Sequence, residues 1–308
     1  MLANESRTRL RLAPALSMIA IPPSPRTATP RSPLPLATIA LSFLAWPARA
    51  PAQLYAGLDA AFASRYVWRG VTRVDGAALQ PEGYLGLQLD GGYLSAGAWG
   101  SYELSRAGPS GLSDLGPGRT GFGEIDYWSQ YARALGPVQT SLGFIRYTYR
   151  GTLPGPSRTS AASTSEVYGT IQLSRKYLAP RLAAYWDVDR VRGLYIESSG
   201  TLPIMANPLG EPFWALYVRG LAGYSLGQEL NPSQPNQVAN FAHRGFTHVD
   251  LSLSFDLRPG PLTLHHESHA QWSVDDATRH TSADPADDRR VKFWFELSAS
   301  WTPRVLKW

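Results

Sequence analysis

The most regular feature of this chain is an alternation of apolar and polar residues with a period of two. Because successive side chains of a β-strand point to opposite faces, this pattern predicts strands with one apolar face and one polar face. The clearest case spans residues 248–257, and the same alternation recurs at 166–174 and at 291–301. In that first case the apolar positions are Val249, Leu251, Leu253, Phe255 and Leu257, and the polar ones are His248, Asp250, Ser252, Ser254 and Asp256.

About twelve segments show this pattern, and most approach the roughly 9–11 residues that a tilted strand needs to cross a membrane. An even number of such strands is typical of bacterial single-chain barrels. We therefore predict an all-β fold, a transmembrane up-and-down antiparallel β-barrel of about 12 strands. The expected segments are 54–69, 80–90, 93–104, 121–135, 137–149, 164–175, 180–189, 194–200, 213–226, 246–257, 262–274 and 289–301.

The connections between these segments alternate in length, as they do in outer-membrane barrels. Short turns such as 91–92, 136–137 and 258–261 are expected at the periplasmic end. Long loops rich in Gly, Pro, Ser and Asn are expected outside the cell, where they narrow the mouth. Two connections break the alternation of lengths. The connection 190–193 is short where a long one is expected, and 201–212 is long where a short one is expected. Tyr and Trp gather near the segment ends, which is typical of the girdles at the two membrane interfaces.

The N-terminal region reads as a secretory signal peptide. Basic residues precede an uncharged apolar stretch at 34–46, which is too short to cross a bilayer comfortably. Small residues at Ala48, Ala50 and Ala52 offer cleavage sites after Ala50 or Ala52. We expect a signal region at 1–52 and a barrel domain at 53–308, and hence export to the cell outer membrane of a Gram-negative bacterium.

Composition narrows the possible chemistry. Cysteine is absent, which excludes disulfides, thiol catalysis and thiolate metal sites. The net charge of +5 includes five arginines of the signal region, so the basic balance does not indicate nucleic-acid binding. There is no phosphate-binding Gly-rich loop before a helix, no H-E-x-x-H and no G-x-S-x-G. We expect no cofactor.

One stretch resembles a known family. Residues 63–72, Ala-Ser-Arg-Tyr-Val-Trp-Arg-Gly-Val-Thr, are similar to the first-strand signature of the TorF-type porins of the outer membrane. The segments 80–84, 92–101, 124–127 and 143–151 resemble later strands of that family, so the similarity is best over 54–151. The resemblance implies a small barrel and a pore, and it implies no substrate or catalytic set.

The polar face of the strands supplies the candidate site residues. Mixed rings of charge in a wet lumen set the ion preference of a pore by their local potential. By simple counting Arg146, Glu124, Asp126 and Arg219 fall on the apolar face, so we expect them near an interface or behind a β-bulge. The pore-lining candidates are Asp59, Arg65, Arg69, Glu166, Asp187, Asp189, Asp250, His265, Glu267, His269 and Glu296.

A histidine cluster leaves other chemistry open. His265, Glu267 and His269 share one strand face, and a tight hairpin would put Asp250 opposite His269 and Ser254 opposite His265. An Asp–His pair beside a serine could form a hydrolase relay, and the His-Glu-His row could hold a divalent metal. The alternation places this row in the lumen, where such polar residues normally line the wall. We therefore expect no catalytic residue and no metal site.

The sequence thus favours a porin-like channel for passive diffusion of ions or small polar solutes, and not an enzyme. The alternatives are an outer-membrane lipid-modifying hydrolase and a non-conducting structural or adhesive barrel. Expected partners are outer-membrane lipid and lipopolysaccharide, the barrel assembly machinery and the diffusing solutes, with no nucleic acid. Loss of ester hydrolysis in His269→Ala would favour the hydrolase, and conductance without hydrolysis would favour the pore.

Overall fold

The computed structural model describes residues 53–89, 91–105, 112–115, 118–150, 163–173, 178–206, 213–229, 238–280 and 288–301. The expected signal region at 1–52 and the tail after Trp301 lie outside these residues, so the signal peptide stays a prediction. Among the described residues no helix is long and apolar enough to cross a membrane.

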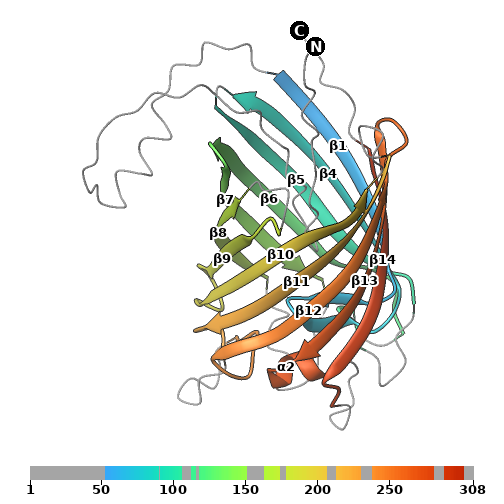
Figure 1. The fold of residues 1–308 in the computed structure, drawn as a ribbon. Coiled ribbons are helices and arrows are strands. Elements are labelled where there is room, and N and C mark those ends of the chain that lie inside the picture. Colours follow the sequence, from blue (N-terminus) through green and yellow to red (C-terminus); the bar gives the residue numbers. More distant parts are fainter. Residues whose placement is uncertain are drawn as a thin grey trace, which may run out of the picture.

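Twelve antiparallel strands close into a barrel, as the alternation predicts (Figure 1). Each strand pairs with its neighbours along the chain, and β1 and β14 pair with each other to close the sheet. The only helix among the described residues, α2 (Asp276–Arg279), lies between the last two strands. The barrel strands are β1 (Gln53–Ala63), β4 (Ala78–Leu89), β5 (Gly92–Glu103), β6 (Gly121–Leu135), β7 (Val138–Tyr149), β8 (Thr164–Leu173), β9 (Arg181–Asp187), β10 (Leu194–Ala206), β11 (Trp214–Leu226), β12 (Gly245–Leu257), β13 (Leu262–Ser273) and β14 (Val291–Trp301).

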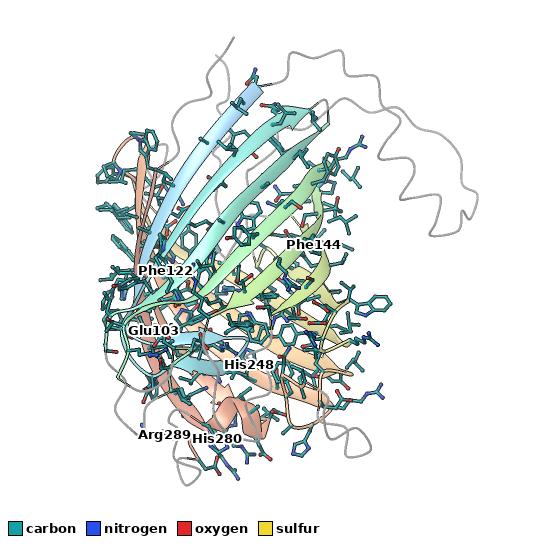
Figure 2. All side chains as sticks on the ribbon, turned by 180° about the vertical axis from the view of Figure 1, so that it is seen from behind. Glu103, Phe122, Phe144, His248, His280 and Arg289 are labelled. Atoms are coloured by element: carbon teal, nitrogen blue, oxygen red, sulfur yellow. The ribbon has the colours of Figure 1, made fainter. Side chains whose placement is uncertain are left out.

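The two faces of the sheet differ in the way a membrane barrel requires. Large apolar side chains are exposed on the outside, among them Leu58, Phe144 (labelled in Figure 2) and Leu251. The side chains between them are polar or aromatic and are buried in the lumen. Apolar side chains are favourable on the outside because they contact the hydrocarbon of the lipid. The closed sheet forms the backbone hydrogen bonds that lipid cannot provide. The alternation of apolar and polar residues in the sequence therefore corresponds to alternation between the outer face and the lumen face of each strand.

The two ends of the barrel carry different connections. We call the end at which β1 begins and β14 ends the termini end, and the opposite end the hairpin end. The longest connections, 64–77, 104–120, 150–163, 227–244 and 274–290, all join strand ends at the hairpin end, whereas the two-residue connections 90–91 and 136–137 join strand ends at the termini end. The predicted sorting of loops by length is present in the structure.

The first expected strand, 54–69, is wrong at its C-terminal half. β1 ends at Ala63, and the chain then turns inward to form a small separate hairpin of β2 (Tyr66–Trp68) and β3 (Val71–Val74). Its two tip residues, Arg69 and Gly70, both have positive φ, of 48° and 82°. Two central residues with positive φ are the backbone condition for a tight hairpin turn, and the apolar pattern of 54–69 carries no sign of this break.

The expected strand 194–200 is too short. β10 continues to Ala206, with an irregularity in its pairing to β11 between Pro203 and Met205. Proline lacks the N–H that a strand donates, so the sequence pattern ends there although the strand does not. The following connection is correspondingly shorter than the expected 201–212.

Tyrosine rings lie against glycines of the wall. A Cβ atom added at Gly57 would fall 2.2 Å from the Tyr84 ring, and one at Gly86 would fall 1.9 Å from the Tyr55 ring. Gly143 lies under Tyr168 in the same way. Because these glycines lack a side chain, the rings lie along the wall on this side of the barrel, where they pack on one another.

Candidate functional site in the lumen

The β2–β3 hairpin lies inside the barrel and reaches the wall made by β7–β10. Arg69 donates from both terminal nitrogens to the two carboxylate oxygens of Glu166 on β8, at 2.7 and 2.6 Å. The Tyr147 hydroxyl on β7 donates to the same carboxylate at 2.9 Å. Both partners of this ion pair are almost fully buried, with side-chain exposures of 6% and 1%. A bidentate, buried arginine–carboxylate pair is a strong and directional contact.

Aromatic rings surround the same guanidinium. The Cζ atom of Arg69 lies 4.3 Å from the ring centre of Tyr185 on β9, 4.6 Å from that of Tyr195 on β10 and 4.5 Å from that of Trp68 in the hairpin itself. Cations over aromatic faces gain most where water is excluded. Burial acts to lower the pKa of Arg69, but Glu166, Tyr147 and Tyr185 together outweigh this effect and the pKa is raised well above its usual value.

The hairpin tip also binds the opposite wall. Lys292 on β14 donates to the carbonyl oxygen of Gly70 at 2.6 Å, and Gln271 on β13 donates to the same oxygen at 2.9 Å. Lys292 also contacts the hydroxyl of Thr72 at 3.2 Å. A Cβ atom at Gly70 would fall 2.6 Å from the ring of His248 on β12, so the tip lies directly against the wall. The hairpin therefore bridges the lumen.

A second connection covers the base of the hairpin. Arg73 of β3 pairs with Asp114 at 2.7 Å, and both side chains are buried. The segment 112–115 that carries Asp114 is held in turn by Glu103 at the end of β5, which accepts from the backbone N–H groups of Asp114 and Leu115. The hairpin end of the barrel thus contains two chain segments fixed to each other and to the wall.

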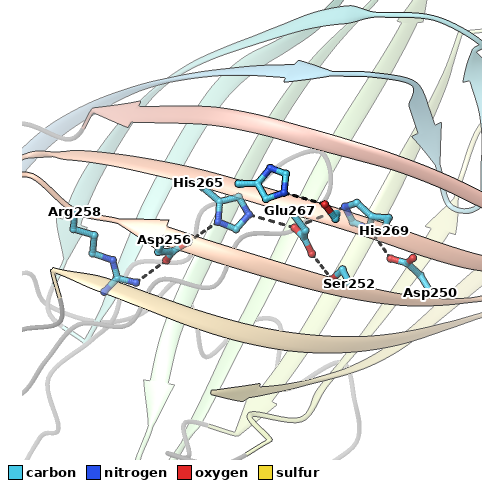
Figure 3. A network of polar contacts seen from close by, with 9 residues as sticks. Asp250, Ser252, Asp256, Arg258, His265, Glu267 and His269 are labelled. Carbon is cyan, nitrogen blue, oxygen red and sulfur yellow. Dashed lines mark hydrogen bonds and ion pairs between the residues drawn. The ribbon is translucent and has the colours of Figure 1, made fainter. Parts of the chain in front are cut away.

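A row of charged residues lines the opposite wall, on β12 and β13 (Figure 3). Asp256 is paired with both Arg258 and His265, and His265 in turn contacts Glu267 at 3.3 Å. His269 binds Asp250 through Nδ1 at 2.8 Å and stacks on Trp294 of β14 with an interplanar angle of 2°. The row consists of two hydrogen-bonded groups, Arg258–Asp256–His265–Glu267 and His269–Asp250, and Glu267 and His269 lie 3.9 Å apart where the two groups meet.

The expected register of this strand pair is offset by two residues. Ser252, and not Asp250, lies opposite His269, while Asp256 lies opposite His265. The expected Asp250–His269 hydrogen bond nevertheless forms along a diagonal. Ser254 lies opposite Glu267 and not opposite His265, and Ser252, which lies opposite His269, donates its hydroxyl proton to Glu267. The Nε2 atom of His269 has no hydrogen-bond partner among the described residues.

The remaining candidates lie in different places. Asp59 and Glu296 face the lumen from the adjacent strands β1 and β14. Arg65 is not on a barrel strand, since it follows β1 and pairs with Asp75 at the base of the hairpin. Asp189 is not in the lumen, because it pairs with Arg146 where both side chains are 39% exposed. Asp187 is buried and accepts hydrogen bonds from the backbone of the β9–β10 connection.

The four charges placed on the apolar face by counting divide between the two faces. Glu124, Asp126 and Arg219 are buried in the lumen, so that placement is wrong for them. The strand pairing is irregular between Ser101 and Tyr102 on β5, opposite β6, and between Gly223 and Tyr224 on β11. An irregularity of this kind shifts the alternation of faces, so counting every second residue gives the wrong face. Arg146 does point outward, near the hairpin end of β7.

Sequence reasoning missed the residues that hold the hairpin. Lys292 reads as an ordinary polar position of an alternating strand, and Tyr185 and Tyr195 read as strand formers. The Arg-Gly pair at 69–70 between two short apolar runs is a local hairpin signal that could have indicated the turn. Contacts among these residues depend on the closed barrel, which brings distant strands together, so the sequence alone does not predict them. The described residues contain no group of three or more His, Asp or Glu side chains suited to a metal ion.

No protein-family model and no curated protein matches the chain. Solved structures of outer-membrane proteins resemble it in fold. An outer-membrane channel from Pseudomonas putida F1 has 11% identity to this chain and a TM-score of 0.49, and the match covers 83% of this chain and 97% of the channel. LpxR from Salmonella typhimurium has 8% identity and a TM-score of 0.48, covering 80% and 99%. The translocator domain of the autotransporter NalP from Neisseria meningitidis has 8% identity and a TM-score of 0.37, covering 81% and 88%.

Similarities this remote define no function for this chain. The resemblance of residues 63–72 to the TorF-type porins likewise stays a prediction, because no family model matches.

Proposed function

We propose that this protein is a porin-like channel of the outer membrane, through which ions or small polar solutes diffuse passively, and that it is not an enzyme. One observation carries the proposal: the closed barrel is apolar outside and lined inside by charged residues such as Glu166, Asp250 and Glu267. A wet, charged lumen is the physical requirement for conducting ions across a membrane. Outer-membrane lipid, lipopolysaccharide and the barrel assembly machinery are the partners this proposal implies.

The decisive measurement is the single-channel conductance of the protein, purified from outer membranes and reconstituted in a planar bilayer. Discrete current steps support the channel, and a salt gradient then gives the ion preference. A heat-modifiable, correctly folded barrel that produces no steps, either as the wild type or after the contacts of the β2–β3 hairpin are broken, would overturn the proposal.

A second candidate is a non-conducting barrel, and the hairpin specifically favours it. The β2–β3 hairpin bridges the lumen from Glu166 to Lys292, so it restricts passage at this level. A channel requires a path beside the hairpin or displacement of the hairpin. Current that appears only after the hairpin contacts are broken would assign the protein to gated channels, and absence of current even then would assign it to structural barrels.

A further inference from the structure

The barrel wall contains a site, here called the seat, that surrounds one guanidinium group. Four successive strands contribute to it: Tyr147 from β7, Glu166 from β8, Tyr185 from β9 and Tyr195 from β10. In the structure the Arg69 guanidinium fills this seat. The guanidinium of Arg69 also lies over the ring of Trp68, which belongs to the hairpin and not to the wall.

The seat has the features that distinguish guanidinium recognition from general cation binding. Glu166 receives two parallel hydrogen bonds, which match the planar fork of a guanidinium and not the point charge of an ammonium. The Tyr147 hydroxyl fixes the carboxylate through Oε2. Tyr185 and Tyr195 offer faces on which a flat, weakly hydrated cation can stack.

Arg69 reaches the seat at a conformational cost. Its φ of 48° lies in the left-handed region, which residues with a Cβ atom avoid. A non-glycine residue persists there where its contacts over-determine the conformation. The seat therefore supplies one of the interactions that keep the hairpin tip in place, and a ligand that fills the seat competes directly with that interaction.

We propose that the seat formed by Tyr147, Glu166, Tyr185 and Tyr195 is a binding site for a guanidinium-bearing solute, and that Arg69 occupies it as a tethered stand-in until such a solute displaces the hairpin. This inference rests on the proposed channel function, since it names the class of solute that the channel admits. Binding to the seat and opening of the lumen are then one exchange of guanidinium groups.

The test of binding uses the Arg69→Ala variant, in which the seat loses its tethered occupant. Titration of this variant in detergent with methylguanidinium chloride, followed by calorimetry, is expected to show one site per barrel. The wild type, with its seat occupied, is expected to bind at least about tenfold more weakly. Methylammonium chloride is the matched ligand and is expected to bind at least about tenfold more weakly than methylguanidinium, equivalent to ~1.4 kcal/mol.

The matched protein control is the double variant Arg69→Ala, Glu166→Gln, which keeps the shape of the seat and removes its charge. Loss of methylguanidinium binding in the double variant supports the assignment. Equal binding of methylguanidinium and methylammonium to the single variant, or unchanged binding in the double variant, would overturn it.

A measurement on the wild type keeps the test valid where Arg69→Ala fails to fold. Displacement of the hairpin is expected to expose Arg69 and Arg73 to trypsin. Methylguanidinium is therefore expected to accelerate cleavage there at constant ionic strength, relative to a reference peptide that corrects for its direct effect on trypsin, whereas sodium is not. Equal cleavage rates in the two salts would contradict the proposal.

Bilayer recordings separate the two proposals. Current through Arg69→Ala that methylguanidinium alters and methylammonium does not supports both. Current that methylguanidinium leaves unchanged leaves the channel standing and overturns the seat. Methylguanidinium binding without current in any variant retains the seat as a ligand site and overturns the channel.

Discussion

At the scale of single residues, two aspartates that are equivalent in the sequence have different roles. Asp187 and Asp189 lie two positions apart, and both count as lumen-facing by alternation. In the structure Asp187 accepts hydrogen bonds from the backbone N–H groups of Asp189, Val191 and Arg192 and from the Thr164 hydroxyl. Asp189 makes a half-exposed ion pair with Arg146. Asp187 is therefore a structural residue of the short β9–β10 connection.

This difference predicts a contrast in stability. Asp187→Ala leaves three backbone donors without their acceptor and is expected to lower the free energy of unfolding by at least about 2 kcal/mol. Asp189→Ala removes only an exposed ion pair and is expected to cost less than about 1 kcal/mol. Urea unfolding in detergent micelles, followed by tryptophan fluorescence, measures both. Equal destabilisation by the two substitutions would show that Asp187 does not organise the connection.

At the scale of elements, the β2–β3 hairpin is the feature that distinguishes this barrel from an empty one. It is docked on one wall by Arg69 and on the other by Lys292, which donates a charged hydrogen bond to the Gly70 carbonyl. A hydrogen bond from a charged group contributes about 1.5–3 kcal/mol of stability, so the loss of either contact is expected to reduce the docked population of the hairpin strongly. If the protein is the channel proposed above, the docking of the hairpin is expected to determine how much of the lumen is open.

Breaking the contact on the β14 wall is expected to release the hairpin. Lys292→Met keeps the apolar stem and removes the ammonium, so the undocked population should rise at least about tenfold. Single-channel recordings would show this as larger or longer openings. The neighbouring outward-facing substitution Phe293→Leu is the control and is expected to leave the currents unchanged. Identical recordings from Lys292→Met and wild type would mean that this contact does not hold the lumen closed.

The reverse experiment locks the hairpin in place. The chain has no cysteine, so a disulfide can be introduced without competing thiols. A Cβ atom at Gly70 would lie 3.1 Å from the Cβ atom of His248, slightly closer than the roughly 3.5–4.5 Å of natural disulfides. The double variant Gly70→Cys, His248→Cys is expected to conduct less when oxidised than when reduced. Each single variant should show no redox dependence, and current unaffected by oxidation of the double variant would argue against a moving hairpin.

The hairpin also shows where prediction from the sequence ends. Alternation depends on local chemistry, because lipid and lumen select opposite side chains at each strand position, and it therefore identified all twelve strands. It could not detect that 66–74 leaves the wall, since a hairpin packed inside the lumen is as apolar and as β-prone as a strand. Pairings such as Arg69 with Glu166 join residues nearly a hundred positions apart, and nothing near either residue in the sequence records them.

At the scale of the whole molecule, the charge on the lumen wall is unbalanced. Among the described strand residues that face the lumen, the carboxylates are more numerous than the basic side chains, which are Arg181, Arg219, Lys292 and the histidines His248, His265 and His269. A surplus of one sign in a confined, low-dielectric space concentrates the opposite ions. The lumen-facing carboxylates of the strands are Asp59, Glu82, Glu103, Glu124, Asp126, Glu166, Asp187, Glu197, Asp250, Asp256, Glu267 and Glu296.

This imbalance predicts a preference for cations. In a potassium chloride gradient the reversal potential should have the sign of cation flow. Glu296→Gln, which removes a carboxylate from the wall without touching the hairpin, should move it toward zero. Arg219→Gln, which removes a positive charge from the same lumen, should move the reversal potential the other way, because the carboxylate of Glu197 then keeps only one of its two arginine neighbours, Arg181 at 3.1 Å. A reversal potential of the opposite sign would show that Arg69 and Arg73 in the hairpin, and not the carboxylates of the wall, control the narrowest part of the path.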